Sequence, residues 1–272
     1  MCSRFLVRVT ILGSGSDGNA LLLESRTTSV LVDAGLSHRK LVQRFTALGR
    51  EAPNNIEAVI VTHSHTDHAA HASTYATRFG CPIRASEAAM PSIRLRPTAQ
   101  AQPFTVGRAF RLGDITIHSR SLPHDAPQVA LVFETTATKV GLVTDLGHVP
   151  KGLERFLDDC ETVLLESNHD PDMLATGPYP EALKQRVAGS LGHLSNGEAG
   201  DLLAGLAHAP RRVVLMHLSE TNNSAQLARS SAEAALGHRG TELLLARQQQ
   251  PLELDAGQDG HDGHDEQFQL IL

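Results

Sequence analysis

The spacing of apolar and polar positions along this chain predicts a mixed α/β protein. Short apolar runs bounded by turn residues predict strands, whereas apolar positions three or four residues apart predict helices. The predicted strands are residues 5–12, 20–24, 30–33, 58–61, 115–119, 129–134, 140–145, 163–166, 212–215, 242–246 and 252–254. The predicted helices are residues 36–48, about 69–79, 150–157, about 195–207 and 225–235.

Local signals refine several of these elements. Ser37 is a predicted N-cap, and Ser195 with Glu198 forms a predicted capping box. The strands at 20–24 and 30–33 should pair as a hairpin, and those at 242–246 and 252–254 as a closing pair.

The order of elements indicates the architecture. Strands come in runs and helices are interspersed, so the sheets should be mixed rather than purely parallel. This order fits a four-layer αββα sandwich with a site at one edge of the two sheets. Residues 1–254 form one predicted domain, because the chain contains no internal repeat and no linker. Residues 255–272 are acidic and poor in apolar residues, which predicts a flexible tail.

Composition indicates the class of protein and its cellular compartment more than its function. A chain of 272 residues that is 41% apolar can bury a large core, and it has no run long enough for a membrane span. Its three cysteines are far apart, which favours a reducing, cytoplasmic compartment. The net charge of −6 argues against nucleic acid, yet five of the acids lie in the tail. The rest has 25 acids against 24 bases, so charge does not decide the partner.

The strongest chemical signal is the run Val61-Thr-His-Ser-His-Thr-Asp-His68. It places four groups that bind transition metals directly after an apolar strand. His63 and His65 share one direction by their spacing, whereas Asp67 and His68 turn toward a second point. The motif therefore predicts two adjacent metal sites at a strand end.

This motif resembles the signature of the metallo-β-lactamase-fold hydrolases. Further landmarks resemble the WalJ/YycJ-type branch of that superfamily, over roughly residues 5–254. They are Gly13-Ser-Gly-Ser-Asp-Gly-Asn19, Leu31-Val-Asp-Ala-Gly35, Pro123-His-Asp125, Thr144-Asp145, Glu166-Ser-Asn-His-Asp170, Gly192-His-Leu-Ser-Asn196 and His217-Leu-Ser219. The resemblance implies a metal-dependent hydrolase with 5′-to-3′ exonuclease activity on DNA.

The resemblance also implies a ligand set for two divalent metal ions. His63, His65 and His124 would hold the first ion; Asp67, His68 and His217 the second; Asp145 would bridge them. Nitrogen and oxygen ligands without cysteine favour Zn²⁺ and also suit Mn²⁺ or Fe. A hydroxide bridging the ions would attack a phosphodiester.

The expected catalytic residues are Asp67, His193 and Glu166. In the tRNA 3′-processing endonucleases, which share this fold, a histidine in a context similar to that of His193 is thought to protonate the leaving oxygen, oriented by a glutamate. Glu166 is similarly placed, although Glu166-Ser-Asn-His-Asp170 departs from the endonuclease pattern. For His148, His169 and Asn168 two alternatives stay open: they contact the substrate or the metal ligands, or they are ordinary loop residues.

Three functions remain in competition. A phosphodiesterase acting on DNA should have a broad groove, whereas an enzyme for a small phosphodiester, a thioester or a lactone should have a closed pocket. A non-enzymatic metal-binding protein should lack one of the expected ligands, and none is missing. Sequence leaves the oligomeric state open.

Overall fold

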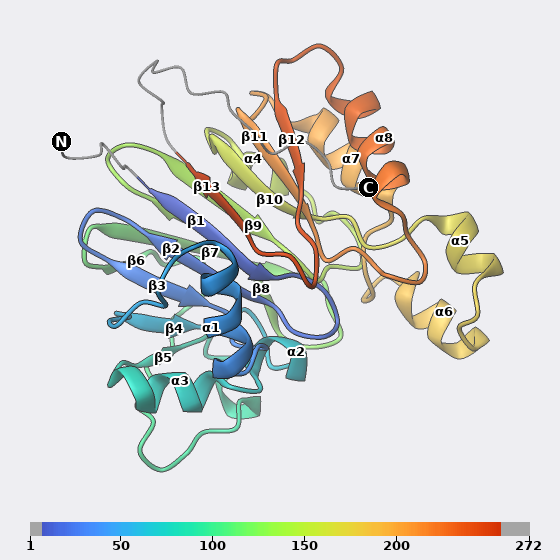
Figure 1. Cartoon of the computed structure of the whole chain (residues 1–272). Helices are drawn as coiled ribbons and strands as arrows, with labels where there is room; N and C mark the ends of the chain where they lie inside the picture. Colours follow the sequence, from blue (N-terminus) through green and yellow to red (C-terminus); the bar gives the residue numbers. More distant parts are fainter. Residues whose placement is uncertain (1–6, 257–272) are drawn as a thin grey trace.

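Two mixed β-sheets pack face to face in this protein, and helices cover the outer face of each (Figure 1). The structure is a computed structural model and describes residues 7–256. This arrangement is the expected four-layer αββα sandwich, and it confirms the predicted fold class. No helix among residues 7–256 is both long and apolar enough to cross a bilayer.

The first sheet comes mainly from the N-terminal third of the chain. Its strands are, in spatial order, β13 (Leu252–Asp255), β1 (Arg8–Gly13), β2 (Ala20–Glu24), β3 (Ser29–Val32), β4 (Ala58–Ile60) and β5 (Ile83–Arg84). The pairs from β13 to β3 are antiparallel, and those from β3 to β5 are parallel. The expected hairpin is therefore confirmed as β2–β3.

The second sheet comes from the remainder of the chain. Its strands are, in spatial order, β12 (Glu242–Leu245), β11 (Arg212–Met216), β10 (Thr162–Glu166), β9 (Lys139–Val143), β8 (Gln128–Glu134), β7 (Ile115–Leu122) and β6 (Phe110–Leu112). The pairs from β12 to β9 are parallel, and those from β9 to β6 are antiparallel.

Nine helical segments connect the strands described between residues 7 and 256. They are α1 (His38–Ala47), α2 (Thr66–Ala69), α3 (Ala72–Phe79), the 3-10 turn η1 (Met90–Ser92), α4 (Leu153–Leu157), α5 (Pro171–Thr176), α6 (Glu181–Val187), α7 (Asn196–Gly205) and α8 (Ala225–Leu236). Ser37 caps α1 through the peptide nitrogen of Lys40, and the predicted capping box of Ser195 and Glu198 opens α7.

Apolar side chains form three clusters that hold the layers together. One lies between the sheets and includes Ile11 and Phe133. A second packs α1 and α3 on the first sheet through Phe45 and Tyr75, and a third packs α4, α7 and α8 on the second. Burial of apolar area on both faces of each sheet is the main stabilising contribution to such a sandwich.

The structure corrects three details of the sequence prediction. β12 and β13 are not a pair: residues 246–251 cross between the sheets, so β12 joins β11 and β13 joins β1. The helix expected from about residue 69 is interrupted, because α2 ends at Ala69 and α3 starts at Ala72. β9 ends at Val143, so Asp145 lies on the loop beyond the strand.

The C-terminal boundary lies slightly beyond the predicted one. β13 runs to Asp255, and the peptide N–H of the buried Ala256 donates to Val7 at 2.7 Å. The predicted flexible tail otherwise lies outside the described residues.

Three polar residues share an unusual backbone conformation just after a strand. Asp33 follows β3, Asp145 follows β9 and His217 follows β11, with φ of 57°, 56° and 54°. Such left-handed geometry is uncommon outside glycine and is held only by surrounding contacts. It turns the chain sharply at the sheet edge and aims all three side chains at one place.

Candidate dinuclear metal centre

The carboxyl ends of β4, β7, β9, β10 and β11 bring their polar residues to one edge of the sandwich. There, four overlapping groups of side chains have ligand atoms within 4.8 Å of one another. They are His63, His65 and His124; His63, His68 and Asp145; Asp67, His68 and His217; and Asp145, Glu166, His193 and His217. All seven predicted ligands therefore lie together, and the two predicted catalytic partners join them.

The first group is a triangle of imidazoles. His63 lies 4.6 Å from His65 and 5.1 Å from His124 between ring centroids. The His65 Nδ1 and His124 Nε2 atoms are 3.3 Å apart. His63 is completely buried, whereas 32% of the His65 side chain is exposed, so the triangle reaches from the buried interior to the surface.

The second group is built by the short helix α2. Its single turn presents Asp67 and His68 toward His217, which follows β11. Asp67 Oδ2 lies 3.4 Å from His68 Nε2 and 3.7 Å from His217 Nε2. Asp145 Oδ2 lies 3.2 Å from His68 Nε2, and Asp145 also groups with His63. Asp145 is thus placed between the two groups.

Each ligand imidazole has its second ring nitrogen beside an outer partner. The contacts are His63 Nδ1 to Thr62 Oγ1 (3.2 Å), His65 Nε2 to Asp125 Oδ1 (3.1 Å), His68 Nδ1 to Asp33 Oδ2 (2.7 Å), His124 Nδ1 to the Gly192 carbonyl (3.1 Å) and His217 Nδ1 to Glu166 Oε1 (3.1 Å). Such partners fix ring orientation and tautomer in metal sites. They leave Nε2, or Nδ1 in His65, facing the cluster.

Two of the ring nitrogens that face the cluster indicate that the site fits a cation. The Nε2 atoms of His63 and His217 are buried and have no hydrogen-bond partner within residues 7–256. An unsatisfied buried polar atom costs about 1–3 kcal/mol, and coordination to a cation removes that cost. The donors are imidazoles and carboxylates with no thiolate among them, a set that suits divalent transition metals.

Charges inside the cluster shift the protonation of its members. Burial opposes ionisation of Asp145, but His217 and His68 hold the pKa of this carboxyl well below its usual value. Burial disfavours charge on His68 as well, yet Asp145 and Asp33 raise its pKa well above 6.5. Burial and the neighbouring His68 lower the pKa of His63, which favours the neutral form that binds metals.

His193 and Glu166 form a hydrogen-bonded pair beside the predicted ligands. His193 Nδ1 donates to Glu166 Oε1 at 2.7 Å, and the same oxygen accepts from His217 Nδ1. The other carboxylate oxygen accepts from the peptide N–H groups of Leu146 and Leu194. Burial opposes its charge, but His193 lowers the pKa of Glu166 to about 2. Burial likewise opposes charge on His193, and Glu166 raises its pKa above 6.5.

Asp125 and Arg186 extend the site beyond the residues predicted from the sequence. Asp125 follows His124 and contacts His65, while its Oδ2 accepts from Arg186 Nε at 2.9 Å and Nη2 at 2.8 Å. Asp125 belongs to the Pro123-His-Asp125 motif and lies beside a predicted ligand, but neither signal indicates its contact with His65. Arg186 lies on α6, 61 residues away, and no local pattern indicates it.

Asp33 and Asn19 also contact the cluster, although the sequence predicted no role for either. Asp33 Oδ1 accepts from the peptide N–H of Thr62, and its Oδ2 orients His68. Asn19 Nδ2 lies 3.3 Å from Asp67 Oδ2 and 2.8 Å from His68 Nε2. Both belong to motifs that carried the resemblance, but their spacing alone gave no reason to place them here.

The three residues with open roles lie in different places. Asn168 is buried and donates to the His217 carbonyl at 2.9 Å, so it supports that ligand's backbone. His148 is exposed, contacts the Ser190 carbonyl and belongs to none of the four groups. His169 is buried beside α5, outside the groups, and lines a separate cavity of about 290 Å³.

Comparisons with known proteins identify the family of this chain. A family model described as "Beta-lactamase superfamily domain" matches residues 28–218. The exodeoxyribonuclease WalJ of Streptococcus pneumoniae serotype 2 is 32% identical over 244 residues, covering 85% of this chain and 90% of the relative. The exodeoxyribonuclease YycJ of Bacillus anthracis is 32% identical over 240 residues, covering 85% and 89%.

The solved structures show the same fold. The metallo-β-lactamase fold protein YhfI from Bacillus subtilis superposes with a TM-score of 0.70 at 20% identity. That match covers 91% of this chain and 99% of YhfI.

Proposed function

Because this chain belongs to the β-lactamase superfamily, and within it to the group of the WalJ and YycJ exodeoxyribonucleases, we propose that it is a dinuclear metal-dependent phosphodiesterase that degrades DNA. The observation that carries the proposal is the convergence of seven ligands, each histidine with one nitrogen inward and one toward an outer partner. The two relatives supply the substrate class, because both are named exodeoxyribonucleases and their sequence matches cover 85% of this chain.

The ligand groups support a site for two ions. His63 Nε2, His65 Nδ1 and His124 Nε2 would hold the first ion. Asp67, His68 Nε2 and His217 Nε2 would hold the second, with Asp145 shared between them. Zn²⁺ is the favoured metal for this donor set, with Mn²⁺ and Fe as alternatives. When bound, such ions polarise a phosphoryl oxygen and lower the pKa of a coordinated water, which enables hydrolysis near neutral pH.

The side chains then have distinct roles in the hydrolysis. The Asp67 carboxylate lies at the rim of the buried cluster, where it accepts a hydrogen bond from Asn19 and can accept one from the attacking water. Asp145 is buried and ionised, so it offsets part of the positive charge of the ions.

His193 is placed to act as the general acid. Its Nδ1 is fixed by Glu166, which leaves Nε2 to donate a proton to the leaving oxygen. The raised pKa of His193 favours the protonated ring, which is the form that a general acid needs. Glu166 contacts both His193 and His217, so it would hold the general acid beside a residue that would bind the second ion.

We also place this activity in a reducing compartment such as the cytoplasm. The buried thiols of Cys81 and Cys160 support this, since neither forms a disulfide within the described residues.

End-labelled DNA tests the function directly. Protein stripped with a chelator and reloaded with Zn²⁺ or Mn²⁺ is incubated with oligonucleotides labelled at the 5′ or the 3′ end, in single-stranded and duplex form. We expect metal-dependent release of short products from the 5′ end and progressive shortening of the 3′-labelled strand. A chromogenic small phosphodiester, a thioester and a lactone are assayed in parallel. Turnover of one of these with intact DNA would overturn the proposal in favour of a small substrate.

A further inference from the structure

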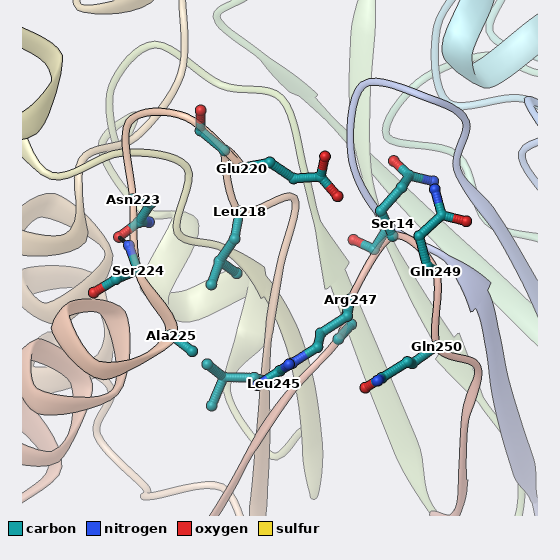
Figure 2. A pocket seen from close by; sticks show the side chains of 13 residues that line it. Ser14, Leu218, Glu220, Asn223, Ser224, Ala225, Leu245, Arg247, Gln249 and Gln250 are labelled. Atoms are coloured by element: carbon teal, nitrogen blue, oxygen red, sulfur yellow. Dashed lines mark hydrogen bonds between the residues drawn. The ribbon is translucent and has the colours of Figure 1, made fainter. Parts of the chain in front are cut away.

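A cavity of about 380 Å³ opens beside the second ligand group. Its walls are the β11–α8 loop and the segment that crosses between the two sheets, residues 246–251, here called the strap (Figure 2). Cavities of this size bind small organic groups in many proteins, where the range is about 300–1,000 Å³. The proposed hydrolysis uses none of its lining side chains.

The cavity is joined directly to the ligand His217. Leu218, the next residue in the chain, lines it, and so does Ser14. The Ser14 Oγ accepts the peptide N–H of His217 at 2.7 Å. A group bound in the cavity therefore lies within one residue of the backbone that positions the second ion.

The strap is held in place before any ligand arrives. Gln248 accepts from the peptide N–H of Asp17 at 3.0 Å and donates to the Gly18 carbonyl at 2.9 Å. Arg44 of α1 donates to the Gln248 carbonyl and to the Gln249 side chain. A wall fixed in this way loses little conformational entropy when a ligand binds.

The chemistry of the lining distinguishes between ligand classes. Leu218 and Leu245 are half-buried and give the cavity an apolar surface. Glu220, Arg247 and Gln250 are exposed, and within residues 7–256 their side chains have neither a hydrogen bond nor an ion pair. Two leucines and a carboxylate disfavour a phosphate inside the cavity. A nucleobase combines a flat apolar face with an edge of donors and acceptors, which matches this lining.

We propose that this cavity binds one unpaired nucleobase of the DNA strand, with Arg247 contacting the adjacent phosphate. The inference rests on the proposed function, since it supplies the subsite that positions the strand for cleavage. The base packs against Leu218 and Leu245, and its polar edge meets Glu220 and Gln250. The strand end must be unpaired to enter, so recognition favours frayed or single-stranded ends.

An abasic scan tests the subsite. Single-stranded oligonucleotides carry one tetrahydrofuran abasic site at successive positions from the 5′ end, so that only a base is removed and every phosphate remains. The metal-loaded enzyme should lose about 5- to 100-fold in kcat/KM at one position near the scissile bond, the range for losing one bound base. A flat profile, or equal losses at every position, would overturn the proposal.

Two variants link that position to the cavity. Ala225 lines the cavity at the start of α8, so Ala225→Phe should fill it; Gln226→Phe, exposed on the same helix, is the matched control. Ala225→Phe should lower kcat/KM on intact DNA and cost nothing further on the sensitive abasic substrate. Arg247→Ala should raise KM on every oligonucleotide, with the exposed Arg108→Ala as control. Neither variant should change turnover of the chromogenic phosphodiester, which also reports that the protein is folded.

Failure of the subsite and failure of the proposed function give different results. If the chromogenic phosphodiester is cleaved and no oligonucleotide is, both ideas are wrong. If DNA is degraded but Ala225→Phe and Gln226→Phe behave alike, the DNA activity stands and the subsite is rejected.

Discussion

At the scale of single residues, the main feature of the site is that each predicted ligand histidine turns one ring nitrogen toward the cluster and the other toward an outer partner. The inward nitrogen would bind the proposed ion, while the contact of the outer nitrogen sets the orientation and tautomer of the ring. His65 depends on the most exposed of these outer contacts, because Asp125 is itself held by the exposed Arg186. The first ion should therefore respond to changes outside the buried cluster.

Removing the outer partner of His65 should weaken the first metal site. We expect Asp125→Ala to lower affinity for one of the two ions by about 10- to 100-fold, as found for outer partners of metal ligands. Arg186→Ala should give a smaller loss, because Asp125 remains. Competition with a chromogenic zinc chelator measures both affinities. Lys184→Ala on the same helix is the control, since within residues 7–256 its amine donates only to the Ala175 carbonyl. Unchanged affinity in Asp125→Ala would assign this carboxylate another role.

Loss of the general acid should separate catalysis from metal binding. His193→Ala should lower kcat by about 10²- to 10⁴-fold with unchanged metal content, because proton transfer to the leaving oxygen is lost. The deficit should shrink on a phosphodiester with a stabilised phenolate leaving group, which departs without a proton. Kinetics on both substrates, with metal analysis of the same samples, decide the question. Equal deficits, or lost metal, would exclude the general-acid role.

At the scale of secondary-structure elements, the sequence predicted the helices and strands that bury an apolar face. The α1 helix falls inside its predicted range, and the hairpin β2–β3 and the capping box of α7 were found correctly. The short elements β5, β6, α5 and α6 were missed. The α6 helix buries none of its side chains, so it has no apolar periodicity to detect.

At the site, the contacts that the sequence did not predict are those between residues far apart in the chain. The His63–His68 run was recognisable because its ligands are adjacent in sequence. The outer contacts join distant segments, such as Asp125 with Arg186, and such pairs become visible only in three dimensions.

The α2 turn is held in place by close packing against the loop that follows β3. A Cβ atom built on Gly35 would lie 1.7 Å from the Asp67 carbonyl oxygen and 2.7 Å from the Asn19 nitrogen. Gly35→Ala should therefore push α2 outward, at a cost of at least about 1–3 kcal/mol, the usual range for overpacking. The melting temperature and the zinc content of the Gly35→Ala protein should both fall. The control is Gly197→Ala, where the nearest atom is 3.9 Å away. A Gly35→Ala protein with normal stability and zinc would contradict this packing argument.

On the scale of the whole molecule, the ligands lie on connections above three apolar clusters. The metals are consequently expected to serve catalysis rather than to hold the sandwich together. His68→Ala or Asp145→Ala should abolish hydrolysis and lower metal content, while far-ultraviolet circular dichroism stays close to that of the unaltered protein. The melting temperature should drop modestly, since His68→Ala leaves Asp33 without its imidazole partner. Loss of secondary structure in step with activity would make the ions structural.

The left-handed backbone at Asp33, Asp145 and His217 has a consequence for protein engineering. Glycine or asparagine would fit these φ values with less strain, at positions where the strain is worth about 1–3 kcal/mol each. A stability-guided redesign blind to chemistry would favour replacement at all three positions. A protein redesigned for backbone strain alone would have lost two predicted ligands and the partner of a third, together with the buried hydrogen bonds that they make. Thermostability screens of this fold should therefore be paired with a turnover assay.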